Sequence, residues 1–364
     1  MLKVGMVGVG NISGIYLQNL TETFKEVELV AVCDLIKKRA LKAQEKWGVP
    51  KVYDTMQELF ADEEIDIVLN LTRPYQHYEV SRQALLAGKH VYSEKPLGIS
   101  IEEGKALVAL AEEKGLWIGG APDTFLGAAI QTARKLIDEG LIGEPIGGRF
   151  CMAGHGMETW HPDPDFFYQR GGGPLFDMGP YYVTAATNLL GRVKKVYGYA
   201  TISYPERLIT SEPLNGTKIK VTTPTHIEAL LHFENGTNAS LLTSFDLYKA
   251  NQPKIEIYGT KGTLLVPDPN HFGGDVIFYD EEGKETTYPL TFDYPENSRG
   301  LGLADMAKAI ESGRRGRTTY RQTLHTLEIM DGILKSATTG APVEIESAYE
   351  REAQMDPSLE HGIL

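Results

Sequence analysis

Between residue 3 and about residue 121, short runs of β-branched and aliphatic residues alternate with longer runs that have helical periodicity. Two of the short runs, VELVAV at residues 27–32 and IDIVLNL at residues 65–71, are almost continuously apolar. Strands of this kind are buried on both faces. The alternation of strand and helix therefore predicts a doubly wound α/β domain, in which helices cover both faces of a parallel sheet.

The pattern changes after a helix that we expect at residues 125–140. Longer strands with hairpin turns follow, for example at Asn235-Gly236, and they predict a mostly antiparallel open sheet. Further helices are expected at residues 175–191, 302–313 and 320–340, and the last dozen residues read as a polar tail. A chain of 364 residues suits two domains. We expect an α/β domain at residues 1–122 and an α+β domain at residues 123–364.

The overall charge limits the partners that the protein can have. A formal net charge of -13 disfavours nucleic acid and anionic membrane surfaces. The basic group Arg314, Arg315 and Arg317 follows an expected helix, where it would offset the helix dipole. Cys33 and Cys151 are too far apart in sequence to suggest a disulfide framework or a zinc site. No stretch is long enough for a membrane span, so we expect a cytoplasmic protein with reduced cysteines.

The first strand ends in a glycine-rich turn. A dinucleotide-binding turn has the pattern G-x-G-x-x-G, but Ser13 stands at the third glycine position and Gly14 follows it. Glycines at the first two positions allow a tight turn and close approach of a pyrophosphate to the next helix. Taken alone, the motif is equally consistent with a structural turn. If it binds a cofactor, we expect the contacts at Gly8, Gly10, Asn11 and Ile12.

The second strand ends at Asp34, at the spacing where an acidic residue binds the ribose hydroxyls of NAD. The alternative interpretation is that Asp34 caps the next helix. Its carboxylate would repel a 2′-phosphate, although Lys37, Lys38 and Arg39 follow closely. We therefore expect NAD as the cofactor, with NADP as the alternative.

The next strands carry polar groups to the same edge of the sheet. Asn70 and Thr72 end one strand, and His77 follows either near the nicotinamide or as a surface group. Glu94-Lys95-Pro96 ends the next strand, where Lys95 is suited to polarise a substrate oxygen; alternatively, Glu94 and Lys95 form an ion pair on a turn. The expected cofactor contacts in this region are Asn70, Thr72, His77 and Glu94.

The second half of the chain supplies the remaining candidates. Gly171 to Gly173 would let backbone approach a ligand, and Pro174 starts a helix on which Asp177 and Tyr181 share a face. An ammonium group such as Lys95 would favour the phenolate of Tyr181 and allow proton transfer. His155, His161, Asp163 and Asp165 lack a compact ligand spacing, so we expect no metal. The expected substrate contacts are Asp123, Trp160, His161 and Tyr182.

Together, the G-x-G turn, Glu94-Lys95-Pro96 and GGGPLFDMGPYY at residues 171–182 resemble the Gfo/Idh/MocA oxidoreductases. The resemblance implies a Rossmann nicotinamide domain, an α+β domain whose open sheet often forms a dimer interface, and site residues Lys95 and Asp177. Many members have histidine where this chain has Tyr181. A tyrosine at this position is similar to glucose-fructose oxidoreductase and dihydrodiol dehydrogenases, and it leaves open whether the acid is Tyr181 or Tyr182. Arg73 stands where members commonly have proline.

These features predict an NAD(P)-dependent oxidoreductase that acts on a sugar, inositol or related polyol. Lys95, Asp177 and Tyr181 are the expected catalytic residues. One alternative retains NAD and uses a transient oxidation for net hydrolysis or epimerisation; another is a sensor of NAD redox state. The expected assembly is a homodimer or homotetramer formed through the C-terminal sheet.

Overall fold

The structure of the protein, a computed structural model, describes residues 1–364. The chain forms two compact units. The first contains residues 1–127, 292–324 and 352–364, and the second contains residues 128–291 and 325–351. The expected division into residues 1–122 and 123–364 differs from these units because the chain returns twice to the first unit after leaving it.

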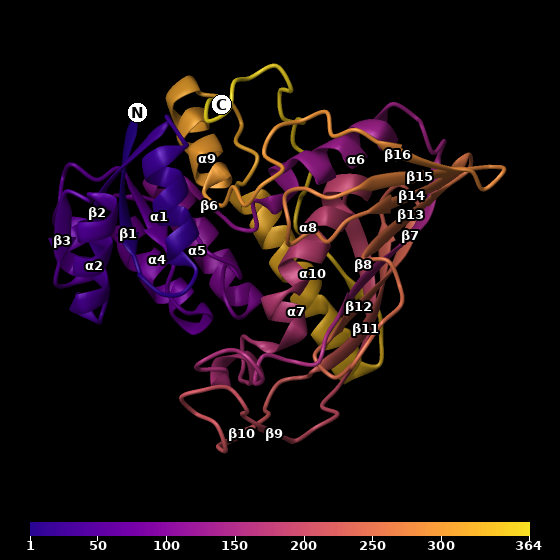
Figure 1. Ribbon diagram of the computed structural model, residues 1–364, viewed down its shortest axis with the longest axis horizontal. Coiled ribbons are helices and arrows are strands. Elements are labelled where there is room, and N and C mark those ends of the chain that lie inside the picture. Colours follow the sequence, from indigo (N-terminus) through magenta and orange to yellow (C-terminus); the bar gives the residue numbers. More distant parts are fainter. The chain divides into compact units, whose positions relative to one another are not determined.

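The first unit is built on a six-stranded parallel sheet. The strands are β1 (Leu2–Val7), β2 (Val27–Cys33), β3 (Lys51–Tyr53), β4 (Ile67–Asn70), β5 (His90–Ser93) and β6 (Ile118–Gly120). Their order is β3-β2-β1-β4-β5-β6, which reverses between β1 and β4 (Figure 1). This order confirms the doubly wound Rossmann sheet, in which ligands bind beyond the carboxyl ends of the strands near the reversal.

Local sequence signals set the ends of several helices in the first unit. The helices are α1 (Ser13–Glu22), α2 (Lys37–Trp47), α3 (Met56–Ala61), α4 (His77–Leu86), α5 (Ile101–Lys114) and α9 (Leu301–Ser312), with short turns η1 (Pro74–Gln76) and η2 (Thr124–Leu126). Thr55 and Glu58 form a capping box that begins α3. Ser100 caps the start of α5, and Gly115 ends it in the left-handed conformation.

The second unit contains a nine-stranded mixed sheet in the order β16-β15-β14-β13-β7-β12-β11-β8-β17. Its strands are β7 (Pro145–Ala153), β8 (Val193–Thr201), β11 (His226–Phe233), β12 (Asn238–Ser244), β13 (Ile255–Gly259), β14 (Gly262–Val266), β15 (Val276–Asp280), β16 (Glu285–Tyr288) and β17 (Val343–Glu344). Only β7 and β12 pair in parallel, so the expectation of a mostly antiparallel sheet is confirmed. A separate hairpin consists of β9 (Glu206–Leu208) and β10 (Lys218–Lys220).

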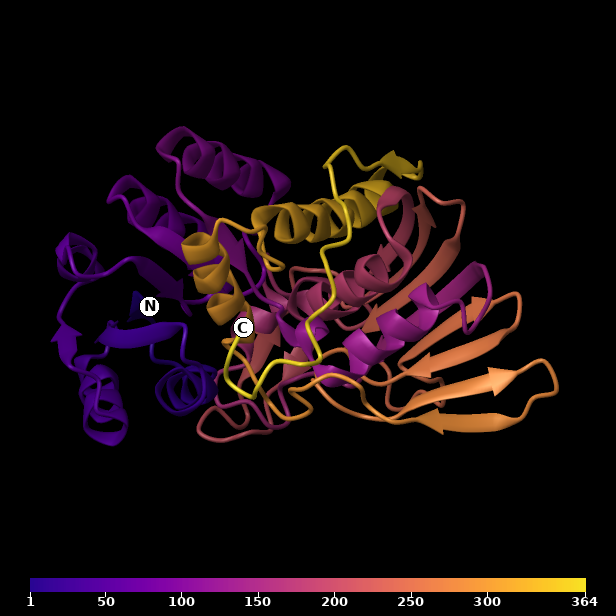
Figure 2. The same cartoon turned by 90° about the horizontal axis from the view of Figure 1, so that it is seen from above.

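Helices cover one face of the nine-stranded sheet. They are α6 (Ala128–Asp138), α7 (Gly173–Asp177), α8 (Gly179–Leu190) and α10 (Tyr320–Thr339), with η3 (Asp165–Tyr168) before α7. The longer helices α6, α8 and most of α10 lie on the same side of the sheet (Figure 2). Tyr197, Tyr199 and Leu230 are 47%, 64% and 58% exposed on the other face. No helix combines the length and apolar character needed to span a bilayer.

The expected single helix that carries Asp177 and Tyr181 is divided into two. Helix α7 ends at Asp177 and α8 begins at Gly179, with Met178 between them. Pro180 explains the division, because proline has no N–H to donate to the carbonyl four residues earlier. Met178 keeps a right-handed helical conformation, with φ -107° and ψ -28°.

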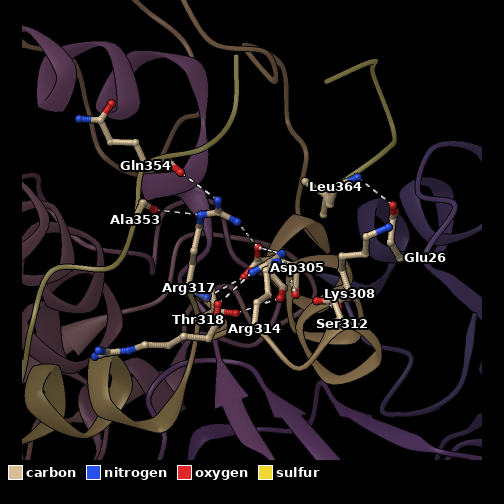
Figure 3. A network of polar contacts seen from close by, with 12 residues as sticks. Glu26, Asp305, Lys308, Ser312, Arg314, Arg317, Thr318, Ala353, Gln354 and Leu364 are labelled. Carbon is tan, nitrogen blue, oxygen red and sulfur yellow. Dashed lines mark hydrogen bonds and ion pairs between the residues drawn. The ribbon is translucent and has the colours of Figure 1, made fainter. Parts of the chain in front are cut away.

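The C-terminal residues are bound to the first unit rather than forming a polar tail. Asp305 of α9 is 0% exposed and pairs with Arg314 at 2.7 Å and Arg317 at 2.6 Å. Arg317 also donates to the carbonyl oxygens of Ala353 and Gln354, as Figure 3 shows. A buried carboxylate therefore holds both arginines, and backbone carbonyls of the returning chain also hold Arg317. These contacts go beyond the expected interaction with a helix dipole.

Candidate functional site

The glycine-rich turn after β1 contains two glycines with different structural requirements. Gly8 has φ +99°, and a Cβ there would lie 2.7 Å from the carbonyl oxygen of Leu71. The fold itself therefore requires glycine at this position. A Cβ at Gly10 would have no atom within 4 Å, and Gly10 is exposed. Glycine at position 10 is consequently not needed for packing, and its open surroundings suit the approach of a phosphate group.

Ser13 has a specific contact in place of the expected third glycine. It begins α1, is 3% exposed, and its Oγ donates to the carbonyl oxygen of Gly10 at 2.7 Å. Ile12 is the N-cap residue and makes no side-chain capping bond. Asn11 and Ile12 are both exposed. The N-terminus of α1, which carries unpaired N–H groups and the positive end of the helix dipole, is thus available for an anion.

Asp34 connects the end of β2 to the glycine turn. Its Oδ2 accepts a hydrogen bond from the Val9 N–H at 2.7 Å, and its Oδ1 accepts one from the Ile36 N–H at 2.7 Å. The alternative that Asp34 caps α2 is wrong, because Ile36 is the N-cap residue and makes no side-chain cap bond. Lys37 pairs with Asp54 at 2.5 Å. The carboxylate is therefore held beside the glycine-rich turn.

Asn70 and Thr72 lie at the end of β4, but their roles differ. Asn70 is 0% exposed, and its Nδ2 donates to the His77 carbonyl at 3.1 Å and to Ser81 Oγ at 3.0 Å. Its Oδ1 accepts from both N–H and Oγ1 of Thr72. Both ends of the Asn70 amide are thus used to shape the loop, whereas Thr72 is partly exposed. Asn70 is placed to support the cofactor region rather than to contact a ligand.

His77 is neither a surface group nor placed to offer a nitrogen to a ligand. It is 1% exposed, with Nδ1 2.7 Å from the Pro96 carbonyl oxygen and Nε2 2.9 Å from the Thr72 carbonyl oxygen. Burial lowers the pKa of His77, and a neutral ring can donate to only one of these carbonyls. The ring joins the loop after β4 to the turn after β5, and its expected contact with the cofactor stays a prediction.

Glu94 holds the turn that carries Lys95. Its Oε1 accepts a hydrogen bond from the phenol of Tyr16 at 2.8 Å, and its Oε2 accepts from the Lys95 N–H at 3.0 Å. The Glu94 N–H donates to the Asn70 carbonyl oxygen at 2.8 Å. Burial raises the pKa of the Tyr16 phenol, which therefore stays a donor. Lys95 is partly exposed at the carboxyl end of β5. Sequence reasoning missed Tyr16 because a single tyrosine in a helix carries no signal of its partner.

Asp123 is buried and bonded to backbone groups, an environment typical of a structural residue. It is 1% exposed, and its Oδ2 accepts hydrogen bonds from the N–H groups of Gly300 and Gly302 at 2.9 and 3.1 Å. These bonds stabilise the start of α9. Burial is the largest cause that raises the pKa of Asp123 to about 6. Asp123 thus has a helix-capping role, and its expected contact with a substrate stays a prediction.

In the second unit, the triple glycine packs backbone against backbone. A Cβ at Gly172 would lie 2.5 Å from the Phe166 carbonyl oxygen, and one at Gly173, where φ is +74°, would lie 2.7 Å from the Pro224 carbonyl oxygen. These contacts explain both glycines without a ligand. They fix the start of α7, which carries the partly exposed Asp177 at its other end.

The two neighbouring tyrosines of α8 are both buried, and the hydroxyl of Tyr182 is bound to a carboxylate of the second unit. Tyr182 is 0% exposed, and its hydroxyl donates to Asp268 Oδ1 at 3.2 Å. Burial and Asp268 both raise the pKa of Tyr182. Tyr181 is 6% exposed. Tyr182 is therefore a packing residue of the second unit, and Tyr181 is the better candidate for the proton-transfer group.

Trp160 and His161 lie on the irregular loop between β7 and η3. Trp160 is 59% exposed, and its ring lies 5.4 Å edge-on from that of His161. The Asp163 N–H donates to Nδ1 of His161 at 3.0 Å, so the neutral ring carries its proton on Nε2. No group of three His, Cys, Asp or Glu side chains could hold a metal ion. The loop therefore offers an aromatic surface and an imidazole donor.

Comparisons with known proteins identify the family of both parts of the chain. Residues 2–119 match the model for the oxidoreductase family with an NAD-binding Rossmann fold, and residues 130–265 match the Gfo/Idh/MocA C-terminal domain. Trans-1,2-dihydrobenzene-1,2-diol dehydrogenase of Bos taurus is 26% identical over 85% of this chain and 87% of the relative. D-xylose 1-dehydrogenase (NADP(+)) 2 of Haloferax volcanii is 25% identical over 94% of this chain and 100% of the relative.

Solved structures share the fold across nearly the whole chain. Levoglucosan dehydrogenase in complex with NADH and levoglucosan has a TM-score of 0.79 and 22% identity, and the match covers 95% of this chain and 100% of that chain. An oxidoreductase of Agrobacterium radiobacter in complex with NAD+, L-tartaric acid and magnesium has a TM-score of 0.75 and 20% identity, over 94% of this chain and 98% of that one. The chain belongs to the Gfo/Idh/MocA family of NAD(P)-dependent oxidoreductases.

Proposed function

We propose that this protein is a dehydrogenase or reductase that acts on a CH–OH or carbonyl carbon of a sugar, inositol, or related polyol, with NAD as the preferred cofactor. The turn at Glu94-Lys95-Pro96 is the observation that carries the proposal. Tyr16, Asn70 and His77 hold this turn by hydrogen bonds from three directions. Such support suits a lysine that must keep one position during a reaction.

The residues around the first glycine turn fit a dinucleotide. The open position at Gly10 and the uncapped N-terminus of α1 suit a pyrophosphate. Asp34, held by two backbone N–H groups, suits the ribose hydroxyls and disfavours a 2′-phosphate. When bound, the nicotinamide ring accepts or donates the hydride.

The proposed proton chemistry belongs to three side chains. Lys95 stabilises negative charge on the substrate oxygen. The phenolate of Tyr181, which an ammonium group such as Lys95 favours, receives the proton that the hydroxyl loses in the oxidative direction. Asp177 accepts a hydrogen bond from a neighbouring substrate hydroxyl. We assign Tyr181 this role because Tyr182 is buried against Asp268.

Substitution of Lys95 and Tyr181 tests the proposal. We expect Lys95→Met and Tyr181→Phe each to lower kcat by about 100-fold or more, the usual contribution of a positioned acid or base. NADH affinity, measured by fluorescence titration, should change only a few-fold. Tyr182→Phe is the matched control, since it removes a hydroxyl from the same helix outside the proposed chemistry. Turnover retained in either test variant would remove that residue from the mechanism.

Cofactor stoichiometry separates this function from an enzyme that retains NAD. A net dehydrogenase forms one NADH for each substrate molecule oxidised, whereas net hydrolysis or epimerisation leaves the NADH absorbance unchanged. Substrate loss should therefore be followed by chromatography together with absorbance, against cyclic polyols, aldoses, sugar acids and diols. Product formation without NADH accumulation would contradict net dehydrogenation and would support net hydrolysis or epimerisation.

The exposed face of the nine-stranded sheet supports a proposed homo-oligomer. Tyr197, Tyr199 and Leu230 form an exposed apolar group on neighbouring strands, and surfaces of this kind commonly bind another protein. We expect Tyr199→Glu to reduce the molecular mass measured by light scattering. An unchanged mass would exclude this face as the interface. The buried, unpaired Cys33 and Cys151 support the proposed cytoplasmic location.

A further inference from the structure

A buried arginine in the second unit lies between two carboxylates. Arg207, in the β9–β10 hairpin, donates from Nη1 to Glu158 Oε1 at 2.8 Å and from Nη2 to Asp246. The three side chains are only 5–6% exposed. Breaking a buried ion pair leaves an uncompensated charge, so the positions of such groups are strongly coupled.

Further contacts are made by both terminal nitrogens of this arginine and by its guanidinium face, whereas its Nε is buried without a hydrogen-bond partner. Its Nη1 also donates to the His155 carbonyl oxygen at 3.2 Å, and its Nη2 donates to the Phe245 carbonyl oxygen at 3.0 Å. The guanidinium carbon lies 4.7 Å from the centre of the Tyr204 ring and 5.6 Å from that of Tyr168. Planar recognition of this kind is specific to arginine, because lysine has no fork of donors.

Both carboxylates have a second hydroxyl partner. Glu158 Oε2 accepts from the Tyr168 hydroxyl, which itself accepts from the Met157 N–H at 3.1 Å. Asp246 Oδ2 accepts from Thr225 Oγ1 at 2.8 Å. Burial and Glu158 both raise the pKa of Tyr168, so its hydroxyl remains a donor. The network therefore joins the loop at residues 154–170, which we call the aromatic loop, to the hairpin and to the end of β12.

The hairpin also binds the backbone of the aromatic loop next to its candidate substrate residues. Thr210 and Ser211 donate from their N–H groups to the Glu158 carbonyl oxygen at 3.0 and 3.2 Å. Ser211 Oγ donates to the carbonyl oxygen of His161 at 2.6 Å. The aromatic loop has little regular secondary structure besides η3, so these bonds and the arginine network add to the contacts that Trp160 and His161 make within the loop.

We propose that Arg207 is the positioning residue of the aromatic loop: by binding Glu158 and Asp246 together, it holds Trp160 and His161 in the arrangement that recognises the substrate. This inference rests on the proposed function for the substrate roles of Trp160 and His161. It adds that the β9–β10 hairpin, which is distant from those roles in sequence, determines substrate affinity.

Trp160 provides a reporter that needs no substrate. The chain has three tryptophans, so Trp47→Phe with Trp117→Phe leaves Trp160 as the only one. In this background, we expect Arg207→Met to lower the fluorescence anisotropy of Trp160, because the loop gains mobility. Lys218→Met is the matched control: Lys218 lies in the same hairpin and pairs with Glu206 at 2.9 Å, but both side chains are more than half exposed. The control should leave the anisotropy unchanged.

Steady-state kinetics separates positioning from a merely structural role. Measured well below the unfolding temperature, Arg207→Met should raise KM for an accepted substrate by about tenfold, the equivalent of about 1.4 kcal/mol. The value of kcat should change less than KM, and NADH affinity should stay constant. Arg207→Lys retains the charge without the fork and should show an intermediate KM. An unchanged KM in a folded Arg207→Met variant would overturn the inference.

A milder variant covers the case in which Arg207→Met does not fold. Tyr168→Phe removes only the hydroxyl that binds Glu158 and Met157, and it should lower Trp160 anisotropy to a smaller extent. Unchanged anisotropy in both Tyr168→Phe and Arg207→Lys would overturn the inference. A parent protein that oxidises no polyol, sugar or diol would overturn the proposed function, whereas reduced Trp160 anisotropy would still support the role of Arg207.

Discussion

The phenol of Tyr16 donates a 2.8 Å hydrogen bond to Glu94, a residue 78 positions later in the chain. This bond joins the first helix after the glycine turn to the turn that presents Lys95. Both residues are buried, so water cannot replace the phenol as a donor. Within the first unit, Glu94 therefore links helix α1 to the backbone of the candidate catalytic residue Lys95 through hydrogen bonds.

Tyr16→Phe should weaken this connection. A buried Glu94 oxygen would lose its donor, so we expect the free energy of unfolding to fall by about 1–3 kcal/mol, as measured by urea denaturation. The control is Tyr320→Phe, which removes a 2.7 Å bond to Glu112 at an exposed site and should cost less. Equal losses in the two variants would contradict a special role for the Tyr16 bond.

The two glycines of the turn should respond differently to alanine. Gly10→Ala should fold normally, since the added Cβ meets no atom within 4 Å, but raise the NAD dissociation constant by about tenfold or more. Gly8→Ala should destabilise the fold because of its φ of +99° and its contact with Leu71.

Gly14→Ala is the matched control for the turn, because its added Cβ also meets no atom within 4 Å. NAD binding by Gly14→Ala should be unchanged. Weaker binding there would instead assign the third-glycine role to Gly14. Ser13→Gly should weaken NAD binding only slightly, through loss of the 2.7 Å bond that holds the Gly10 carbonyl.

Asp34 should control the choice between NAD and NADP. Asp34→Ser removes a charge that repels a 2′-phosphate, so we expect the NADP to NAD ratio of kcat/KM to rise by about tenfold. Adding Asp54→Asn should increase the ratio further, since it releases Lys37 from its 2.5 Å pair. Asp54→Asn alone is the control and should have little effect. An unchanged ratio in Asp34→Ser would place cofactor selection elsewhere.

His325 should make the protein sensitive to acid. Burial, with a smaller effect of Arg192, lowers the pKa of His325 from 6.5 to about 3. The unfolded chain therefore binds a proton below pH 6.5 that the folded protein does not bind. This contribution to stability is complete above pH 6.5 and decreases towards pH 3, by about 1.4 kcal/mol per pH unit.

Urea unfolding at several pH values would test the His325 prediction. His325→Gln should flatten the slope between pH 6.5 and pH 4, whereas the exposed His232→Gln should not. The contribution of Asp123 to stability depends on pH in the opposite direction, because its pKa is raised. This contribution is complete below pH 3.8 and is lost as the pH rises through about 6. If the free energy of unfolding of His325→Gln falls between pH 6.5 and pH 4 as steeply as that of the parent protein, this histidine does not cause the acid sensitivity.

Arg317 should hold the returning C-terminal chain to the first unit. Arg317→Met removes one cation from Asp305 and both donors to residues 353 and 354, so we expect about 1–3 kcal/mol of lost stability. Hydrogen exchange at residues 352–364 should accelerate. Arg82→Met, which breaks a surface pair with Glu79, is the control. Unchanged exchange in Arg317→Met would refute the attachment.

The sheets were partly predictable because their signals are local. Continuous apolar runs identify strands buried on both faces, and this property identified the parallel sheet of the first unit. The central strand β7 escaped prediction, since PIGGRFCMA begins with proline and contains two adjacent glycines. Its strand conformation is determined by its neighbours β12 and β13, which lie about a hundred residues further along the chain.

The sequence also predicted which residue types lie at the candidate site, but it did not predict the orientations of their side chains. Asn70, His77 and Asp123 are each expected to contact a ligand, and the structure shows each of them bonded to backbone groups. The partner carbonyl and N–H groups come from other segments, and nothing in the sequence around an asparagine or histidine specifies them. Arg207 was missed for the same reason, because its two carboxylates come from separate loops.

The double return of the chain has a consequence for the order of folding during synthesis. The six strands of the first unit leave the ribosome early, yet α9 and residues 352–364 belong to that unit. Residues 128–291 of the second unit are continuous and emerge in between. The first unit therefore has all six strands but lacks α9 and residues 352–364 while most of the other unit is made. Chaperone binding to stalled nascent chains of increasing length would reveal that interval.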